Sequence, residues 1–154
     1  MHEPANWPKS VSATRFVLKG GTLQGNGGLI SAPVTSNATV IAGDSKTKTG
    51  TLNVASYTQS SSGTLEVQIK GTTSSSCSLT GAGTTFSLLN SLNGVGLNGT
   101  LQVNNLVQLH SGDCYVIITG TVLTGQFANV IPAGKFTVNY ATGATPPQVQ
   151  LIVN

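Results

Sequence analysis

Apolar and polar residues alternate over many short segments of this chain. In the clearest run, TLEVQIKG at residues 64–71, every second residue is apolar. Because successive side chains of a β-strand point to opposite faces, such a run predicts a strand with one buried face. Similar runs recur along the chain, each bounded by turn-forming residues. The residues predicted to face inward are Leu52, Val54, Leu65, Val67, Ile69, Leu101, Val103, Ile117, Phe136 and Val138.

No window repeats apolar residues at the helical spacing, so the sequence predicts an all-β chain. The tripeptide Gly-Thr-Leu starts at Gly21, Gly50, Gly63 and Gly99. Glycine allows a tight turn and threonine suits the start of a strand, so the copies indicate one structural step used repeatedly. The copies have no fixed period, which favours a β-solenoid of irregular coils. A β-sandwich fits the composition almost as well, and a closed barrel is a third all-β solution.

The composition bounds the domain organisation and the partners. Residues 1–15 are polar and predict an irregular lead-in, and residues 16–154 are expected to form a single domain. Charged residues make up only 7% of the chain, with a formal net charge of +3. The few cations are scattered without interleaved aromatic residues, which argues against nucleic-acid binding. The longest apolar runs are too short to span a bilayer, so we expect no membrane insertion by this chain.

The acidic residues argue against an enzyme. Carbohydrate-cleaving β-helices need paired carboxylates, or carboxylates with a metal or strong base. The chain has only Glu3, Asp44, Glu66 and Asp113. Glu3 lies in the lead-in and Glu66 is expected on the polar face of its strand. Asp44 and Asp113 each follow a glycine, where aspartate commonly hydrogen-bonds within its own turn.

Other candidate chemistry is equally sparse. A nucleophilic set of Cys114, His110 and Asp113 would have to converge within one turn, which such sets rarely achieve. His110 and Cys114 are too few to hold a metal. We therefore expect no catalytic residue, cofactor or metal site. Trp7 and the three tyrosines form no obvious platform for stacking sugars, and the two glycosylation sequons, at residues 37–39 and 98–100, are of a length that arises by chance.

Three glycine-rich stretches together resemble the β-helical passenger domain of bacterial autotransporters, in particular its passenger-associated strand repeats. They are GTLQGNGGLISAPVTSNATVIAGDS, GTLNVASYTQSSSGTLEVQIKG and LNGTLQVNNLVQLHSGDCYVIITGTVLTGQFANV. The resemblance extends from about Phe16 to the C-terminus. It implies a right-handed parallel β-helix that is secreted or displayed at the surface of a Gram-negative bacterium.

These observations lead to a non-enzymatic extracellular module, namely a surface-displayed passenger or stalk segment with a structural or adhesive role. Its expected partners are surface glycans, or proteins of a host or neighbouring cell. A self-assembling extracellular filament is an alternative, because solenoid ends present unpaired strand edges, and the final run VQLIVN is expected to be such an open edge. A carbohydrate-binding or carbohydrate-active β-helix is a further alternative. Exposed Tyr57, Tyr115 and Tyr140 on one face would favour it.

The two cysteines are expected to form a disulfide. Cys77 and Cys114 lie beside turn-forming residues, and their separation corresponds to between one and two coils of a solenoid. An exported chain meets an oxidising environment, which favours the bond. The alternative is two independent thiols, with Cys114 buried at the start of its strand. The bond would pin the serine- and threonine-rich segment 72–95, which matches no strand repeat, against the better-formed coils.

Overall fold

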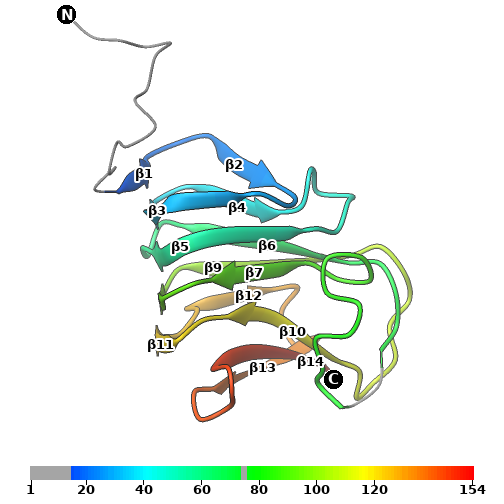
Figure 1. Ribbon diagram of the computed structural model, residues 1–154. Helices are drawn as coiled ribbons and strands as arrows, with labels where there is room; N and C mark the ends of the chain where they lie inside the picture. Colours follow the sequence, from blue (N-terminus) through cyan, green and yellow to red (C-terminus); the bar gives the residue numbers. More distant parts are fainter. Residues whose placement is uncertain (1–14, 74–75) are drawn as a thin grey trace, which may run out of the picture.

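The computed structural model describes residues 15–73 and 76–154, and it contains β-strands and no helix within them. The expectation of an all-β chain is confirmed. Figure 1 shows the strands stacked from the blue N-terminal end to the red C-terminal end. The strands are β1 (Phe16–Leu18), β2 (Thr22–Gly25), β3 (Leu29–Ser36), β4 (Thr39–Ala42), β5 (Thr51–Gln59), β6 (Thr64–Ile69), β7 (Leu88–Ser91), β8 (Gly94–Leu97), β9 (Thr100–Asn105), β10 (Cys114–Thr119), β11 (Val122–Gly125), β12 (Asn129–Ile131), β13 (Phe136–Ala141) and β14 (Gln148–Val153).

The strands form two sheets, and the chain passes alternately from one to the other. The larger sheet has nine strands. Strands β1, β3, β5, β7 and β10 are neighbours in that order, followed by β14 and β13, while β8 pairs with β5 and β11. The smaller sheet has the order β12-β9-β6-β4-β2. All pairings among strands β1 to β12 are parallel. We call the strands that one passage adds to the two sheets a level, so β5 and β6 make one level and β7, β8 and β9 make the next.

The repeated Gly-Thr-Leu step marks the same position on successive levels. In the smaller sheet Leu65 lies beside Leu101, so 36 residues (101 − 65) separate equivalent positions. Leu23 and Val40 occupy the same position on the two preceding levels, and Val130 occupies it on the last level. Three of the four copies of the step therefore lie at the same position of the smaller sheet, with Val40 between Leu23 and Leu65, whereas the copy at Gly50 begins β5 in the larger sheet. The irregular spacing in sequence reflects connections of unequal length.

The core lies between the two sheets and follows the alternation of the strands. Most of the residues predicted to face inward are buried, and Val138 is half-buried against the core. The buried ones are Leu52, Val54, Leu65, Val67, Ile69, Leu101, Val103, Ile117 and Phe136. Side chains from one level stack on those of the next, because parallel in-register strands bring equivalent positions together.

Glycines allow the sharp turns between the sheets. Gly27 has a φ of 78°, in the left-handed region, and lies in the turn that joins β2 to β3. Gly99 has a φ of 68°, and a Cβ there would collide with the carbonyl oxygen of Gly63 on the level before. A residue with a side chain would thus both strain the backbone and push two levels apart.

The C-terminal strand is not an open edge, and that expectation from the sequence is wrong. β14 pairs antiparallel with β10 on one side and with β13 on the other. The final strands form a hairpin that folds back on the last level, which leaves β13 as the edge of the larger sheet. The backbone groups of VQLIVN are therefore paired within the chain. At the other end, residues 1–14 lie outside the described part, and with them most of the expected lead-in.

The segment 72–95 is only partly irregular, which also corrects the sequence analysis. Residues 88–91 and 94–97 form β7 and β8 and belong to the larger sheet. The rest of the segment belongs to the connection between β6 and β7, residues 70–87, which we call the excursion. In Figure 1 it forms part of the loops at the right of the stack.

Candidate functional site

A group of polar side chains lies on the outer face of the smaller sheet, around Glu66 on β6. Glu66 is only 3% exposed. Its Oε1 accepts a hydrogen bond from Nδ2 of Asn104 on β9 (3.1 Å), and its Oε2 lies 3.9 Å from Nζ of Lys46. Lys46 comes from the connection between β4 and β5, which covers this part of the sheet. A buried carboxylate is costly unless paired, and here a cation and an amide compensate it.

Gln68, two residues farther along β6, fastens the covering segments to the sheet. With its amide oriented to suit its neighbours, Nε2 donates to the carbonyl oxygens of Ala42 (2.9 Å) and Lys48 (3.1 Å). The Gln68 backbone N–H donates to Oγ of Ser87 (3.0 Å), which ends the long excursion. Glu66 lies on the polar face of its strand, as expected. Glu66 and Gln68 are nevertheless buried, because the connection between β4 and β5 and the connection between β6 and β7 lie over them.

These contacts make Glu66 part of the packing between the sheet and the connections that cover it. The two-carboxylate mechanism of glycoside hydrolysis needs a second acid at a defined distance. Asp44 is exposed in the turn after β4, and Asp113 lies in the turn before β10. Glu3 lies outside the described residues. Within the described ranges no group of three or more His, Cys, Asp or Glu side chains could hold a metal ion.

Asp113 closes the turn that leads into β10. Its Oδ2 accepts from the backbone N–H of His110 (3.4 Å) and lies 3.9 Å from Nδ1 of the same residue. Asp44 differs from what its sequence context predicts. Its turn is held by Ser45, whose Oγ accepts from the backbone N–H of Thr47 (3.2 Å), while the backbone oxygen of Asp44 accepts from Nε2 of Gln24 (2.7 Å).

The structure joins Cys77 and Cys114 in a disulfide, with an S–S distance of 1.99 Å and a Cα–Cα distance of 4.7 Å. Cys114 therefore has no thiol to act as the nucleophile of a set with His110 and Asp113. The bond ties the middle of the excursion to the first residue of β10.

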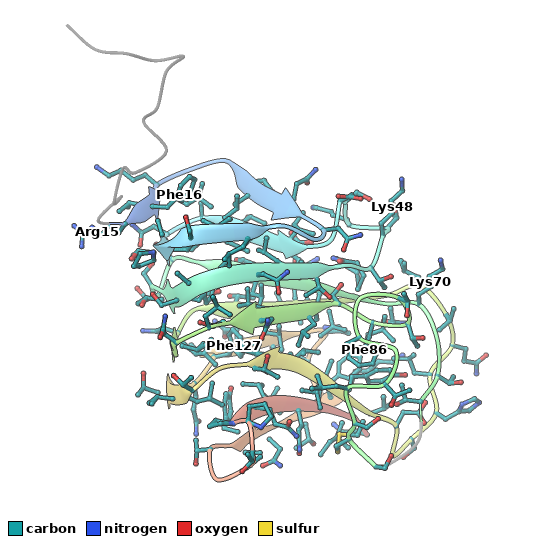
Figure 2. All side chains as sticks on the ribbon, viewed as in Figure 1. Arg15, Phe16, Lys48, Lys70, Phe86 and Phe127 are labelled. Carbon is teal, nitrogen blue, oxygen red and sulfur yellow. A yellow bond between two sulfur atoms is a disulfide. The ribbon has the colours of Figure 1, made fainter. Side chains whose placement is uncertain are left out.

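Further contacts hold the excursion beside the disulfide. Oγ1 of Thr73 donates to the carbonyl oxygen of Cys114 (2.9 Å), and the Tyr115 hydroxyl donates to the carbonyl oxygen of Gly71 (2.9 Å). The rings of Phe86 and Tyr115 meet edge to face, with centroids 5.5 Å apart. In Figure 2, Phe86 lies at the looped segment on the right of the stack, and Phe127 lies to the left of it. The excursion thus joins the main apolar core through Phe86.

The excursion also contains a cavity of about 400 Å³, and hydroxyl groups dominate its lining. It is lined by Thr72, Thr73, Ser76, Ser78, Thr80, Gly81 and Thr85. These groups can hydrogen-bond water or a small neutral polar molecule, but they include neither an acid nor a base.

The tyrosines are not arrayed on an exposed face, contrary to the arrangement that would favour sugar binding. Tyr57 and Tyr115 are fully buried, and Tyr140 is half-buried. Burial raises the pKa of Tyr57, and burial together with the nearby Asp113 carboxylate raises that of Tyr115 to about 12. Burial likewise raises the pKa of Tyr140, whose hydroxyl accepts from the backbone N–H of Phe127. Trp7 lies outside the described residues.

Polar side chains connect one level to the next, both in the interior, as Gln59 does, and at the surface, as Asn26 does, and the sequence predicted no such role for Gln59. Nε2 of Gln59 donates to the carbonyl oxygens of Asn98 (2.6 Å) and Thr100 (3.1 Å), and its Oε1 accepts from the Tyr57 hydroxyl (2.7 Å). Oδ1 of Asn26 accepts from the backbone N–H of Thr51 (3.0 Å) on a later level. The sequence YTQ at residues 57–59, in which Gln59 follows Tyr57 on the same face of a strand, was the signal that could have indicated the role of Gln59.

A second polar ladder follows the outer face of the larger sheet. Nδ2 of Asn90 donates to Oδ1 of Asn53 (3.0 Å), and Oγ1 of Thr119 donates to Oδ1 of Asn90 (2.8 Å). These three residues belong to three successive levels, since β7 pairs with both β5 and β10. Each hydrogen bond joins equivalent positions and so reports the register of the stack.

Comparisons with known proteins identify no relative. No protein-family model, no curated protein and no solved structure matches the chain. Nor do the described residues include a helix long and apolar enough to cross a membrane.

Proposed function

We propose that this chain is a non-enzymatic structural or adhesive segment of an extracellular protein, built as a right-handed parallel β-solenoid. The proposal has three parts, which concern the path of the chain, the use of its polar side chains and its compartment. Each rests on a different observation.

The path of the chain supports the solenoid. Parallel strands of one sheet are joined through a strand of the other sheet, level after level, from β1 to β12. A sandwich of hairpins would instead place sequence neighbours side by side in antiparallel pairs, and among the strands that the structure describes that pairing occurs only between β13 and β14. Crossover connections between parallel strands are right-handed in nearly all proteins, which supports the hand.

The observation that carries the functional proposal is how the buried polar side chains are used. Gln59 and Gln68 bind backbone carbonyl oxygens of neighbouring levels and connections. Glu66 is compensated by Lys46 and Asn104. Polar groups that would be candidates for chemistry in another protein thus serve to hold the stack together. This use is expected of a scaffold whose levels cannot bury their apolar faces alone.

The compartment is inferred from the disulfide. Structural disulfides form and persist in oxidising environments and are rare in the cytosol. The bond between Cys77 and Cys114 closes a loop with a sequence separation of 37 residues and fixes the excursion to β10. Together with the resemblance to autotransporter passengers, it supports export to a bacterial surface. There the segment would act as a stalk or contact surface glycans or proteins of other cells.

The proposal is tested by exporting the chain to the bacterial surface on a heterologous outer-membrane anchor. We expect a folded, protease-resistant chain with its disulfide formed, and we expect cells that display it to adhere to glycan- or cell-coated surfaces. Cells that display a Val67→Asp variant serve as the unfolded control. The same chain is incubated with a panel of polysaccharides and esters. Turnover that Glu66→Gln abolishes would refute the non-enzymatic assignment.

A further inference from the structure

Four threonines form a straight file on the outer face of the smaller sheet. Thr22, Thr39, Thr64 and Thr100 begin β2, β4, β6 and β9, and each lies directly beside the next in the parallel register. We call them the threonine file. Their neighbours in sequence, such as Leu65 and Leu101, point into the core, so the threonine side chains point outward. Adjacent strands are about 4.8 Å apart, and the file repeats at that spacing.

The hydroxyls of the threonine file are available to a ligand. Thr22 is exposed and the other three are half-buried. None of the four hydroxyls hydrogen-bonds to another group in the described part of the chain, in contrast to the asparagine ladder of the larger sheet. Threonine is branched at Cβ and therefore stiff at χ1, so a rigid sheet holds the methyl and hydroxyl groups in fixed positions. The file is a preformed row of small amphipathic groups.

The turns before Thr39, Thr64 and Thr100 are polar and uncharged, whereas Lys19 is exposed three residues before Thr22 and the buried Glu66 lies two residues after Thr64. At the turns before the file, Asn37, Ser62 and Asn98 occupy the position two residues ahead of Thr39, Thr64 and Thr100. Oγ of Ser62 donates to the backbone oxygen of Asn37 (3.3 Å), which ties two of these turns together.

The segments 35–40, 58–64 and 96–101 contain no charged residue. In Figure 2, Lys48 and Lys70 project from the other end of the strands. Glu66 is buried and compensated by Lys46, so these three turns offer a charged ligand no partner and their chemistry favours a neutral one.

We propose that the threonine file binds the surface of an ice crystal. Water molecules in ice form flat, regularly repeating rows, and the spacing of β-strands is close to that repeat. Hydroxyls at fixed intervals can take the place of water molecules in such a row, while the methyl groups fill the space between them. The described tyrosines are buried or half-buried and offer no aromatic face for stacking on a sugar, which disfavours a neutral polysaccharide as the ligand.

The test compares the full chain with two single substitutions. Thr64→Tyr places a bulky ring in the middle of the file, and both residues suit a strand. Thr121→Tyr is the matched control, since Thr121 is exposed just before β11 in the other sheet and its hydroxyl has no hydrogen bond to a described residue. Ice recrystallisation and partitioning into a growing ice front are measured for each protein, with thermal melting as the check on folding.

We expect the wild-type chain and Thr121→Tyr to partition into ice and to slow recrystallisation equally. We expect Thr64→Tyr to require a concentration higher by about tenfold or more for the same effect. If Thr64→Tyr melts early, Thr39→Val keeps the shape while removing one hydroxyl and must also weaken the effect. Exclusion of the wild-type chain from ice, equal activity of the two tyrosine variants, or retention on neutral polysaccharide beads without activity on ice would each overturn the proposal.

Discussion

Replacing Gln59 with methionine should destabilise the chain without changing its shape. Gln59 is 3% exposed and makes its hydrogen bonds across the turn between β5 and β6 and to the next level. Methionine has a similar volume and adapts to its surroundings, so the substitution removes the amide while leaving little cavity. The experiment therefore isolates the polar contribution to stacking.

The magnitude follows from the groups that lose their partner. The carbonyl oxygen of Asn98 and the hydroxyl of Tyr57 each lose the hydrogen bond to Gln59. The carbonyl oxygens of Gly63 and Thr100 also lose a bond to Gln59, but Gly63 keeps its bond from the backbone N–H of Thr100, and Thr100 lies within the parallel ladder of β6 and β9. A buried polar group left unsatisfied costs about 1–3 kcal/mol. Two such groups predict a loss of about 2–6 kcal/mol, which is a large fraction of the stability of a single domain.

The assay is equilibrium unfolding in urea of the wild type, Gln59→Met, Tyr57→Phe and the double variant. The double variant should be less destabilised than the sum of the two singles, because Tyr57→Phe removes the hydroxyl that Gln59→Met leaves unpaired. Gln126→Met, at an exposed position after β11, is the control and should unfold like the wild type. If Gln59→Met is as stable as this control, the buried amide does not hold the levels together and the reasoning is wrong.

Three further predictions follow from other parts of the chain. Val67→Asp should prevent stable folding, because an unpaired charge in the core costs more than about 3–5 kcal/mol; circular dichroism that matches the wild type would contradict this. Replacing both Cys77 and Cys114 with serine should lower the free energy of unfolding by about 3–4 kcal/mol, as measured against the oxidised wild type, because the cross-link constrains the unfolded chain. Stability should fall as the pH rises above about 10, because the unfolded chain releases tyrosine protons there while Tyr115 holds its proton until about pH 12, and burial also raises the pKa of Tyr57. Stability that is constant from pH 9 to 12 would contradict the burial of these hydroxyls.

The alternation of apolar residues predicted the longer strands, such as β5, β6 and β9, and their inward faces, but not the short strands β7 and β8. Leu65, Val67 and Ile69 are buried, as their period-two pattern indicates. Glu66 and Gln68 lie on the opposite, polar face of the same pattern, and both are nevertheless buried. Alternation shows which side of a strand a residue faces. It does not show whether a connection from another level covers that side.

Long-range partners could not be predicted from local pattern either. The expected open edge at VQLIVN was wrong because β14 reaches back to β10, and nothing in the local sequence distinguishes an edge strand from one that is paired on both sides. The register that brings Thr64 beside Thr100 depends on the length of the excursion between β6 and β7. Repetition of Gly-Thr-Leu indicated that equivalent positions exist. The structure was needed to show which of them stack and that the copy at Gly50 belongs to the other sheet.

The most direct test of the stacked arrangement is a nuclear Overhauser measurement on protein with labelled methyl groups. The account predicts cross-peaks between the methyl groups of Leu65 and Leu101, and between those of Val40 and Leu65, because these pairs lie side by side on successive levels. It also predicts no Hα–Hα cross-peaks between β5 and β6. Cross-peaks that pair β5 antiparallel with β6, and none between Leu65 and Leu101, would show a sandwich of hairpins and contradict the solenoid.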